Sequence, residues 1–241
     1  MRRNLQTVGW TLIWLGTFIF GYLGWQLLGT DVVNAAVQAE AEAALADTFA
    51  QARLQPPEVE QVEVAVPESA DPVSASATVA APEVVKWVKE PEPEPGEAFG
   101  IIRIPKIGLE AVIFSGVDPQ TLKKGPGYMP WTPLPGQPGN SVIAGHRTTY
   151  GRPFFDLDLL EPGDTIEVET TIGVHVYEVR EIIIVKPTDV WVTNPRPGAW
   201  LTLSTCNPKF SARERLIVFA ELVSGPNFEY AELQKAQLGA S

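Results

Sequence analysis

Three side chains of the sequence have the types needed for nucleophilic chemistry: the only cysteine, Cys206, one of the two histidines, His146, and an arginine that follows the cysteine, Arg213 or Arg215. Cys206 ends the run AWLTLST, and His146 likewise follows the run SVIAG, so both are expected where a strand passes into a turn. A thiol with an ordinary pKa near ~8.5 is only slightly ionised at neutral pH, so it needs a base and a charged donor nearby. Imidazole supplies the base, and guanidinium is a permanent cationic donor. The combination favours a cysteine nucleophile, against the alternative of a small buried hydrophobic residue.

The sequence leaves the choice of arginine open. Arg213 and Arg215 stand two residues apart, so both would face the same side of a strand, and either could instead form a surface ion pair with a neighbouring glutamate. The second histidine, His175, lies inside the strand-like run VHVYEV on one face with Tyr177 and Val179. A solvent-facing or locally satisfied histidine is favoured there over an acid–base catalyst.

Short β-rich runs separated by Gly/Pro turns must position these side chains. After Phe99 they cover Gly100–Ile104, Leu109–Phe114, Ser141–Gly145, Thr165–Glu169, Val174–Val185, Trp200–Thr205 and Leu216–Val223. Pro119–Lys124 and Phe154–Leu160 are predicted as short helices. The pattern predicts a mainly-β fold with one antiparallel or mixed barrel of seven to eight strands, over residues 99–225, and a C-terminal tail over 226–241.

The N-terminal region predicts a membrane anchor. Residues 7–28 carry no charge in 22 positions, and a helix of that length spans roughly 33 Å, about the hydrocarbon thickness of a bilayer. The run exceeds the apolar part of a cleaved signal peptide, which is the alternative. Arg2 and Arg3 precede the run and Asp31 follows it, so residues 1–6 are expected in the cytoplasm and the rest of the chain outside the cell.

Two different segments connect this anchor to the barrel. Residues 29–55 are rich in helix formers with an apolar stripe, and predict a helix that continues the anchor or, alternatively, serves as a stalk or partner-docking helix. The stripe consists of Val33, Val37, Ala41, Leu45 and Phe49. Residues 56–98 contain eight prolines up to Glu97 among acidic and small residues, and predict a disordered, extended linker that acts as a tether.

Composition excludes several classes of function. The formal charge is −11, but residues 40–97 hold 13 acidic and 3 basic residues, whereas residues 98–241 hold 15 acidic and 13 basic ones, a net charge of only −2. The folded part therefore has no basic surface for nucleic acid. A single cysteine excludes an internal disulfide and a cysteine-cluster metal site, and two histidines leave little for a zinc centre. No cofactor and no metal are expected, and no acidic cluster compels calcium binding.

The segments NSVIAGHRTTYGRPFFDLDLLEPGD, KPTDV and LTLSTCNPKFSARERLIVFA resemble the sortases, cysteine transpeptidases that cleave sorting signals of surface proteins and join them to an amine. The resemblance covers about half of the chain, and the TLxTC element followed by an arginine and an apolar strand is its most specific part. It implies that Cys206 is the nucleophile, His146 the general acid/base and Arg215 the essential arginine. A substrate groove is then expected near the Pro187–Gly198 loop, with contacts at Ala144, Val192 and Thr205.

HRTTYG and CNPKFSARERLIV look most like class E sortases, which serve as housekeeping enzymes in high-GC organisms and tend to prefer Leu-Ala-X-Thr-Gly over Leu-Pro-X-Thr-Gly. The resemblance implies surface proteins bearing such signals as substrates, and an amine of a peptidoglycan precursor or a pilin as the acceptor. A pilin-polymerising sortase that uses a lysine acceptor and a non-catalytic, membrane-tethered binding domain are the alternatives. L,D-transpeptidases carry a histidine close before the thiol and papain-like proteases place cysteine before histidine, so neither pattern fits.

Overall fold

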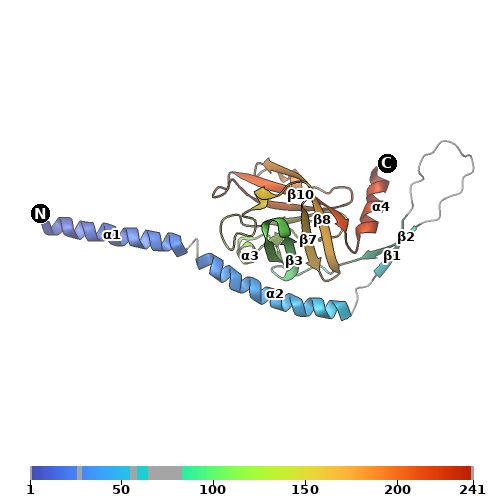
Figure 1. Ribbon diagram of the computed structural model, residues 1–241, viewed down its shortest axis with the longest axis horizontal. Coiled ribbons are helices and arrows are strands. Elements are labelled where there is room, and N and C mark those ends of the chain that lie inside the picture. The colour runs from blue at the N-terminus through green and yellow to red at the C-terminus, as the bar shows by residue number, and fades with distance from the viewer. Residues whose placement is uncertain (1, 26–28, 55–58, 65–82, 240–241) are drawn as a thin grey trace, which may run out of the picture.

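The computed structural model describes residues 2–25, 29–54, 59–64 and 83–239. Its central feature is a β-barrel (Figure 1). The barrel is closed, with the strand order β10-β8-β7-β3-β4-β5-β6-β9. The strands are β3 (Ala98–Ile104), β4 (Leu109–Ser115), β5 (Gly127–Tyr128), β6 (Gly139–Ala144), β7 (Thr165–Thr170), β8 (Gly173–Val185), β9 (Ala199–Asn207) and β10 (Glu214–Ser224). The β4–β5 and β6–β9 pairs are parallel and the other neighbours are antiparallel. The predicted mainly-β barrel of seven to eight strands is confirmed.

The barrel closes around side chains that alternate along its strands. Ile166 and Val168 of β7 and Tyr177 and Val179 of β8 are fully buried, whereas the residues between them are not, as expected for strands with one face toward a core. Leu201 and Leu203 of β9 belong to the same core. The inward and outward positions of β9 and β10 are therefore fixed by their apolar residues.

The connections contain one short α-helix and three 3-10 turns. The helix is α3 (Pro119–Lys124), where Asp118 caps the N-terminus by accepting from the backbone N–H groups of residues 120 and 121. The turns are η2 (Pro105–Ile107), η3 (Leu157–Leu159) and η4 (Val190–Thr193). The predicted helix over Phe154–Leu160 is thus only a set of turns ending in η3, because three apolar residues there insert into the core without completing a helical repeat.

Two N-terminal helices precede the barrel. Helix α1 (Arg2–Gly24) contains one stretch, Gln6–Gly24, that is long and apolar enough to cross a membrane, and it projects away from the barrel (Figure 1). The last part of the predicted anchor, residues 26–28, lies outside the described residues. Helix α2 (Thr30–Leu54) follows and lies along the barrel (Figure 1).

Helix α2 is packed onto the barrel rather than standing free as a stalk. Leu45 and Phe49 are buried against Ile101, Val112 and Phe114 of strands β3 and β4. The Gln38 side chain completes the contact, because its Oε1 accepts from Val112 N at 2.7 Å and its Nε2 donates to Lys124 O at 2.7 Å. The predicted apolar stripe therefore faces the chain's own barrel, although Val33 at its start stays 56% exposed.

The described residues of the predicted linker differ from a disordered tether. Strands β1 (Val59–Val64) and β2 (Glu83–Val88) form an antiparallel pair, in which Val64 lies opposite Glu83. Beyond β2, the Glu90 carboxylate is buried and accepts from Thr171 N and Oγ1 at 3.0 Å each. The acidic composition concealed these contacts, because a few buried apolar and polar groups suffice to bind the segment to a barrel that is already folded.

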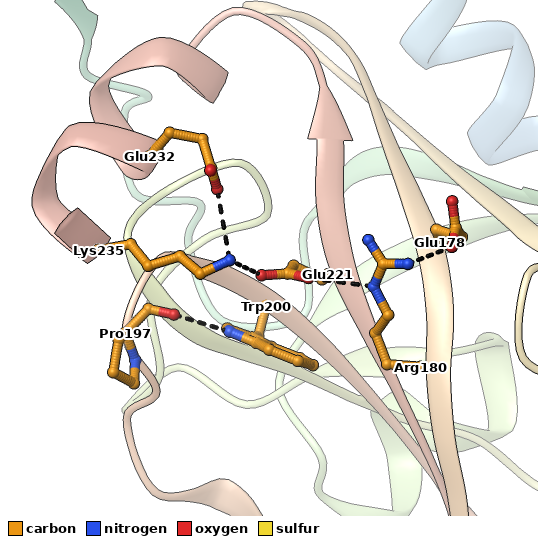
Figure 2. Close-up of polar contacts among 7 residues, drawn as sticks. All are labelled: Glu178, Arg180, Pro197, Trp200, Glu221, Glu232 and Lys235. Atoms are coloured by element: carbon orange, nitrogen blue, oxygen red, sulfur yellow. Dashed lines mark hydrogen bonds and ion pairs between the residues drawn. The ribbon is translucent and has the colours of Figure 1, made fainter. Parts of the chain in front are cut away.

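The C-terminal segment forms a helix, α4 (Phe228–Gly239), instead of a tail. Asn227 just before it exchanges two hydrogen bonds with the Val88 backbone, at 2.8 and 2.9 Å, and the Tyr230 ring stacks on Trp87. Figure 2 shows how α4 is also tied to the barrel wall: Lys235 reaches Glu221 of β10, which accepts from Arg180 Nε of β8 at 3.0 Å. Helix α4 therefore fixes β2 against the barrel.

Candidate active site

Strand register brings the candidate catalytic residues to one end of three adjacent strands. In the β9–β10 pair, Cys206 lies directly opposite Arg215. In the parallel β6–β9 pair, the last matched residues are Ala144 and Ser204, so His146 follows two positions later beside Cys206. Two hydrogen bonds join the segments that follow Ala144 and Ser204: Gly145 N donates to Ser204 O at 3.0 Å, and Thr205 Oγ1 donates to Gly145 O at 2.8 Å. Strand β9, which carries Cys206, therefore lies between β6, which leads to His146, and β10, which carries Arg215.

Cys206 is partly exposed on the outer side of the barrel. Leu201 and Leu203 of the same strand point into the core, and Cys206 has the opposite parity. Arg215 of β10 likewise alternates with the core residue Leu216. Cys206 is therefore not sealed in the interior, and it lies on the same face of the sheet as its register partner Arg215.

His146 is half-buried at the start of the β6–η3 loop. Its ring centroid lies 5.0 Å from that of Tyr150, and Lys123 Nζ lies 5.8 Å from the Tyr150 centroid. Burial, followed by the positive charge of Lys123, lowers the pKa of His146 below its ordinary value of 6.5. The imidazole is accordingly neutral at neutral pH and able to accept a proton.

The register separates the two arginines that sequence parity leaves equivalent. Arg215 lies within β10 opposite Cys206, whereas Arg213 is exposed and precedes the strand. The Arg215 Nη1 atom donates to the carbonyls of Ala212 and Glu214 at 2.9 Å each. Its Nε and Nη2 atoms have no hydrogen-bond partner in the part of the chain that the structure describes, so these donors are free to bind an oxygen beside the thiol.

A second arginine, Arg147, connects the two halves of the site and was missed in the sequence. Only 3% exposed, it donates from Nη1 to Cys206 O at 3.1 Å and to Asn207 Oδ1 at 2.8 Å. Its Nη2 pairs with Asp158 Oδ1 at 3.0 Å. The neighbouring His146 is marked by its residue type, but no periodicity indicates that Arg147 is buried. Only the parallel pairing of β6 with β9 brings it to the strand that carries the thiol.

The three expected substrate contacts have different surroundings. Ala144 is half-buried on β6, two residues before His146 and opposite Ser204. Val192 is buried against Ile217 and Phe219, and Thr205 is buried with its hydroxyl bonded to Gly145 O. Val192 and Thr205 therefore already have partners within the protein, so their positions do not by themselves indicate direct contact with a substrate.

Asn140, another residue missed in the sequence, fixes the loop beside the site. Its Nδ2 donates to the carbonyls of Val192 and Asn194 at 2.9 and 3.1 Å, and its Oδ1 accepts from Thr202 Oγ1 at 2.6 Å. This buried amide anchors η4 to β6. The expected groove wall over Pro187–Gly198 is thus held to the strand that leads to His146.

His175 lies away from the site, in the barrel core. It is fully buried rather than solvent-facing, its Nε2 lies 3.3 Å from Thr170 Oγ1, and burial lowers its pKa to about 4. Its ring fills the space above Gly136, where an added Cβ would lie 2.1 Å from His175 Cε1. Among the residues that the structure describes, no three His, Cys, Asp or Glu side chains form a set able to hold a metal ion.

Comparisons with known proteins agree on one family. The sortase domain model matches residues 102–223. Sortase SrtE1 of Streptomyces coelicolor is 36% identical over 146 residues, which cover 54% of this chain and 42% of that protein. Sortase D of Bacillus subtilis is 34% identical over 158 residues, which cover 64% of this chain and 78% of that protein. The match therefore spans less than half the length of the first relative and most of the second.

Solved structures give the same result. The crystal structure of sortase E1 from Streptomyces coelicolor with a tripeptide in the active site has a TM-score of 0.52 at 33% identity, and the match covers 54% of this chain and 90% of that one. The SrtF sortase from Corynebacterium diphtheriae has a TM-score of 0.53 at 32% identity, covering 56% and 89%. Class E proteins occur in both comparisons, so the expected likeness to this class is confirmed.

Proposed function

The chain belongs to the sortase family, and from this membership we propose that it is a membrane-anchored cysteine transpeptidase with Cys206, His146 and Arg215 as its catalytic residues. The observation that carries the proposal is the placement of an accessible Cys206 opposite Arg215 and beside the loop of His146. The substrate is a surface protein with a Leu-Pro/Ala-X-Thr-Gly sorting signal, cleaved between Thr and Gly. The likeness to class E favours the form with Ala.

In the first half-reaction, the sulfur of Cys206 attacks the threonine carbonyl carbon while its proton passes to His146. The lowered pKa of His146 supports transfer at this step, because a neutral imidazole can accept the proton. A C–S bond forms, and the free N–H groups of Arg215 donate to the developing oxyanion. The C–N bond then breaks, and His146 returns the proton to the departing glycine amine.

In the second half-reaction, an amine attacks the thioester carbonyl and His146 accepts the proton that this amine loses. The C–S bond breaks, His146 returns this proton to the leaving sulfur of Cys206, and the product carries a new amide bond. The acceptor is an amine of a peptidoglycan precursor. Ala144, half-buried beside His146, contacts the bound signal, while Val192 and Thr205 shape its surroundings from within the protein.

The proposed placement follows from α1. One apolar helix supports a single-pass anchor, with residues 1–6 in the cytoplasm, residues 7–28 crossing the membrane and the barrel of residues 99–225 on the outer face. In this arrangement the enzyme meets substrates and acceptor at the membrane surface.

Mass spectrometry of the intact chain in detergent micelles tests the proposal. Incubation with Leu-Ala-X-Thr-Gly or Leu-Pro-X-Thr-Gly peptides should add the acyl fragment ending in Thr to Cys206. The Cys206→Ala variant should gain no mass. Absence of an adduct with every signal tried would instead support a non-catalytic binding domain.

The acceptor requires a separate comparison. Adding glycine-type or lysine-type amines to the acyl-enzyme should release the amide of the preferred nucleophile. We expect glycine-type or peptidoglycan-stem amines to react faster. A strong preference for a lysine side chain within a pilin peptide would identify a pilin polymerase instead.

A further inference from the structure

The loop that follows His146 adopts an unusual backbone conformation. Tyr150, Gly151 and Arg152 are three consecutive residues with positive φ, at 53°, 76° and 49°. Left-handed backbone is unfavourable for residues with a Cβ, so a run of this kind persists only where its surroundings hold it.

The first turn of α2 holds this loop from outside the barrel. Asp31 Oδ1 accepts from Gly151 N at 3.0 Å, and Asp31 Oδ2 pairs with Arg152 Nε at 3.3 Å. Three residues later, Asn34 closes over the loop so tightly that a Cβ on Gly151 would lie 2.1 Å from Asn34 Oδ1. The glycine is thus needed both for its φ and for the approach of the helix.

The same turn of α2 also fixes the second neighbour of the histidine. Asn34 Nδ2 donates to the carbonyls of Lys123 and Lys124 at 2.9 Å each, at the C-terminal end of α3. Lys123 lies over the Tyr150 ring, and that ring contacts His146 with 5.0 Å between centroids. Contacts therefore run from Asp31 through Gly151, and from Asn34 through Lys123, to Tyr150, whose ring contacts the imidazole.

We propose that the first turn of α2 is part of the catalytic site, with Asp31 as a positioning residue that holds the loop of residues 146–152 and thereby orients His146. The inference rests on the proposed transpeptidase function. It gives the segment before the barrel a role that an anchor or a spacer does not have. The role is carried by polar side chains that bond the barrel's loop backbone, in addition to the apolar packing further along α2.

Variants of Asp31 in the full chain in detergent micelles test this. Asp31→Ala removes both contacts, whereas Asp31→Asn keeps an acceptor for Gly151 N and loses the ion pair. We expect kcat for peptide cleavage to fall roughly 10- to 100-fold in Asp31→Ala, because misplacement of a catalytic group by about 1 Å is that costly, and less in Asp31→Asn. KM should change little, since Asp31 is not part of the proposed substrate groove at Ala144 and η4. Asp47→Asn, an exposed aspartate on the same helix, is the matched control and should retain wild-type values.

The imidazole provides a readout that does not depend on turnover. The chain has two histidines, so an NMR titration of the ring C–H signals follows His146 directly and His175 as an internal reference. Releasing the loop exposes His146 and moves it from Lys123, so its pKa should rise toward 6.5 in Asp31→Ala while that of His175 stays unchanged. A merely structural contact would lower the melting temperature and leave this pKa in place.

A second variant keeps the inference falsifiable if Asp31→Ala folds poorly. Gly151→Ala should displace Asn34 and reproduce the loss of kcat and the rise in the pKa of His146. Gly108→Ala is its control, because Gly108 has a similar φ of 62° and open space where the Cβ would stand. Wild-type kcat and an unchanged His146 titration in both Asp31→Ala and Gly151→Ala would overturn the inference. If the wild-type chain forms no acyl-enzyme, the proposed function fails, and the titration still decides whether α2 positions His146.

Discussion

Arg215 and Arg213 differ in one respect that the proposed chemistry needs, since only Arg215 is paired by register with the thiol-bearing residue. Arg215→Ala should lower kcat/KM for peptide cleavage roughly 100- to 1,000-fold, the usual loss when one oxyanion donor is removed. Arg213→Ala should stay within about twofold of the wild type. Steady-state cleavage of a fluorogenic signal peptide measures both. A reversed pair of results would mean that the donor comes from the turn before β10.

Lys123 provides a test of the electrostatics around His146. Its positive charge is the second cause, after burial, of the lowered pKa of His146. Lys123→Met removes a like charge, so the pKa of His146 should rise, and the signal of His175 should not move. NMR titration reads out both rings. Lys186→Met is the control: Lys186 is exposed and does not contribute to the lowered pKa of His146, so the His146 titration should stay unchanged.

The strands were predictable because their side chains alternate, but contacts that use backbone atoms were not. The inward positions of β7 and β8 follow from Ile166, Val168, Tyr177 and Val179. Strand β5 has only two residues, which is too short for any period to show. Gln38 stands beside the apolar stripe of α2, and no periodicity in the sequence indicates that its side chain bonds the backbone of β4.

The site was predictable to a similar extent. Cys206 and His146 are marked by residue type at the ends of strand-like runs, so the sequence indicates them without a fold. The choice of Arg215 over Arg213 rested on the family resemblance, and the strand register supports it independently. Arg147 and Asp31 act through partners that are distant in sequence, and no local pattern reports such contacts.

Helix α2 is expected to stabilise the barrel through its apolar side. Phe49→Ala should lower the free energy of unfolding by about 3 kcal/mol, since Phe49 is 6% exposed and packs on Ile101, Val112 and Phe114. Leu54→Ala on the same helix should change it by less than about 0.5 kcal/mol, because Leu54 is 83% exposed. Urea unfolding of the full chain in micelles compares them. Equal stabilities would mean that α2 is a free stalk.

The buried Glu90 makes the attachment of the segment after β2 dependent on pH. Burial raises its pKa from 4.5 to about 7, so the folded state binds more protons than the unfolded chain between these values. The stabilisation is complete below about pH 4.5 and is lost as the pH rises through 7, up to about 3 kcal/mol in all. Glu90→Gln removes this loss, so the variant should gain about 2–3 kcal/mol relative to the wild type between pH 5 and pH 8.

Urea titrations at the two pH values measure that gain. His175, whose pKa is lowered to about 4, loses stabilisation in the opposite direction, as the pH falls below 6.5. Its contribution is common to both proteins and cancels in the difference. Glu92→Gln, an exposed neighbour, should show no such change with pH, and a pH-independent difference for Glu90→Gln would contradict the assignment.

The chain contacts the barrel on both sides of residues 65–82, through α2 before them and through the segment after β2. Because Val64 and Glu83 are paired, residues 65–82 can be replaced by Asn-Gly, which closes a two-residue hairpin. We expect this deletion to leave kcat and KM within about twofold of the wild type in nanodiscs that contain a lipid-anchored substrate. If the segment were the tether, shortening it should reduce the rate with this substrate while sparing a soluble peptide.

The packing of α2 on the barrel limits how far the active site can lie from the bilayer. Asp31 bonds the loop of His146 and follows Gly24, the last residue of α1, by seven positions. Seven residues span about 25 Å even when fully extended. With α1 as the proposed anchor, the thioester forms within a thin layer next to the lipid headgroups. A sorting signal must therefore remain close to the membrane when it is cleaved, and the acceptor that resolves the thioester must be equally close.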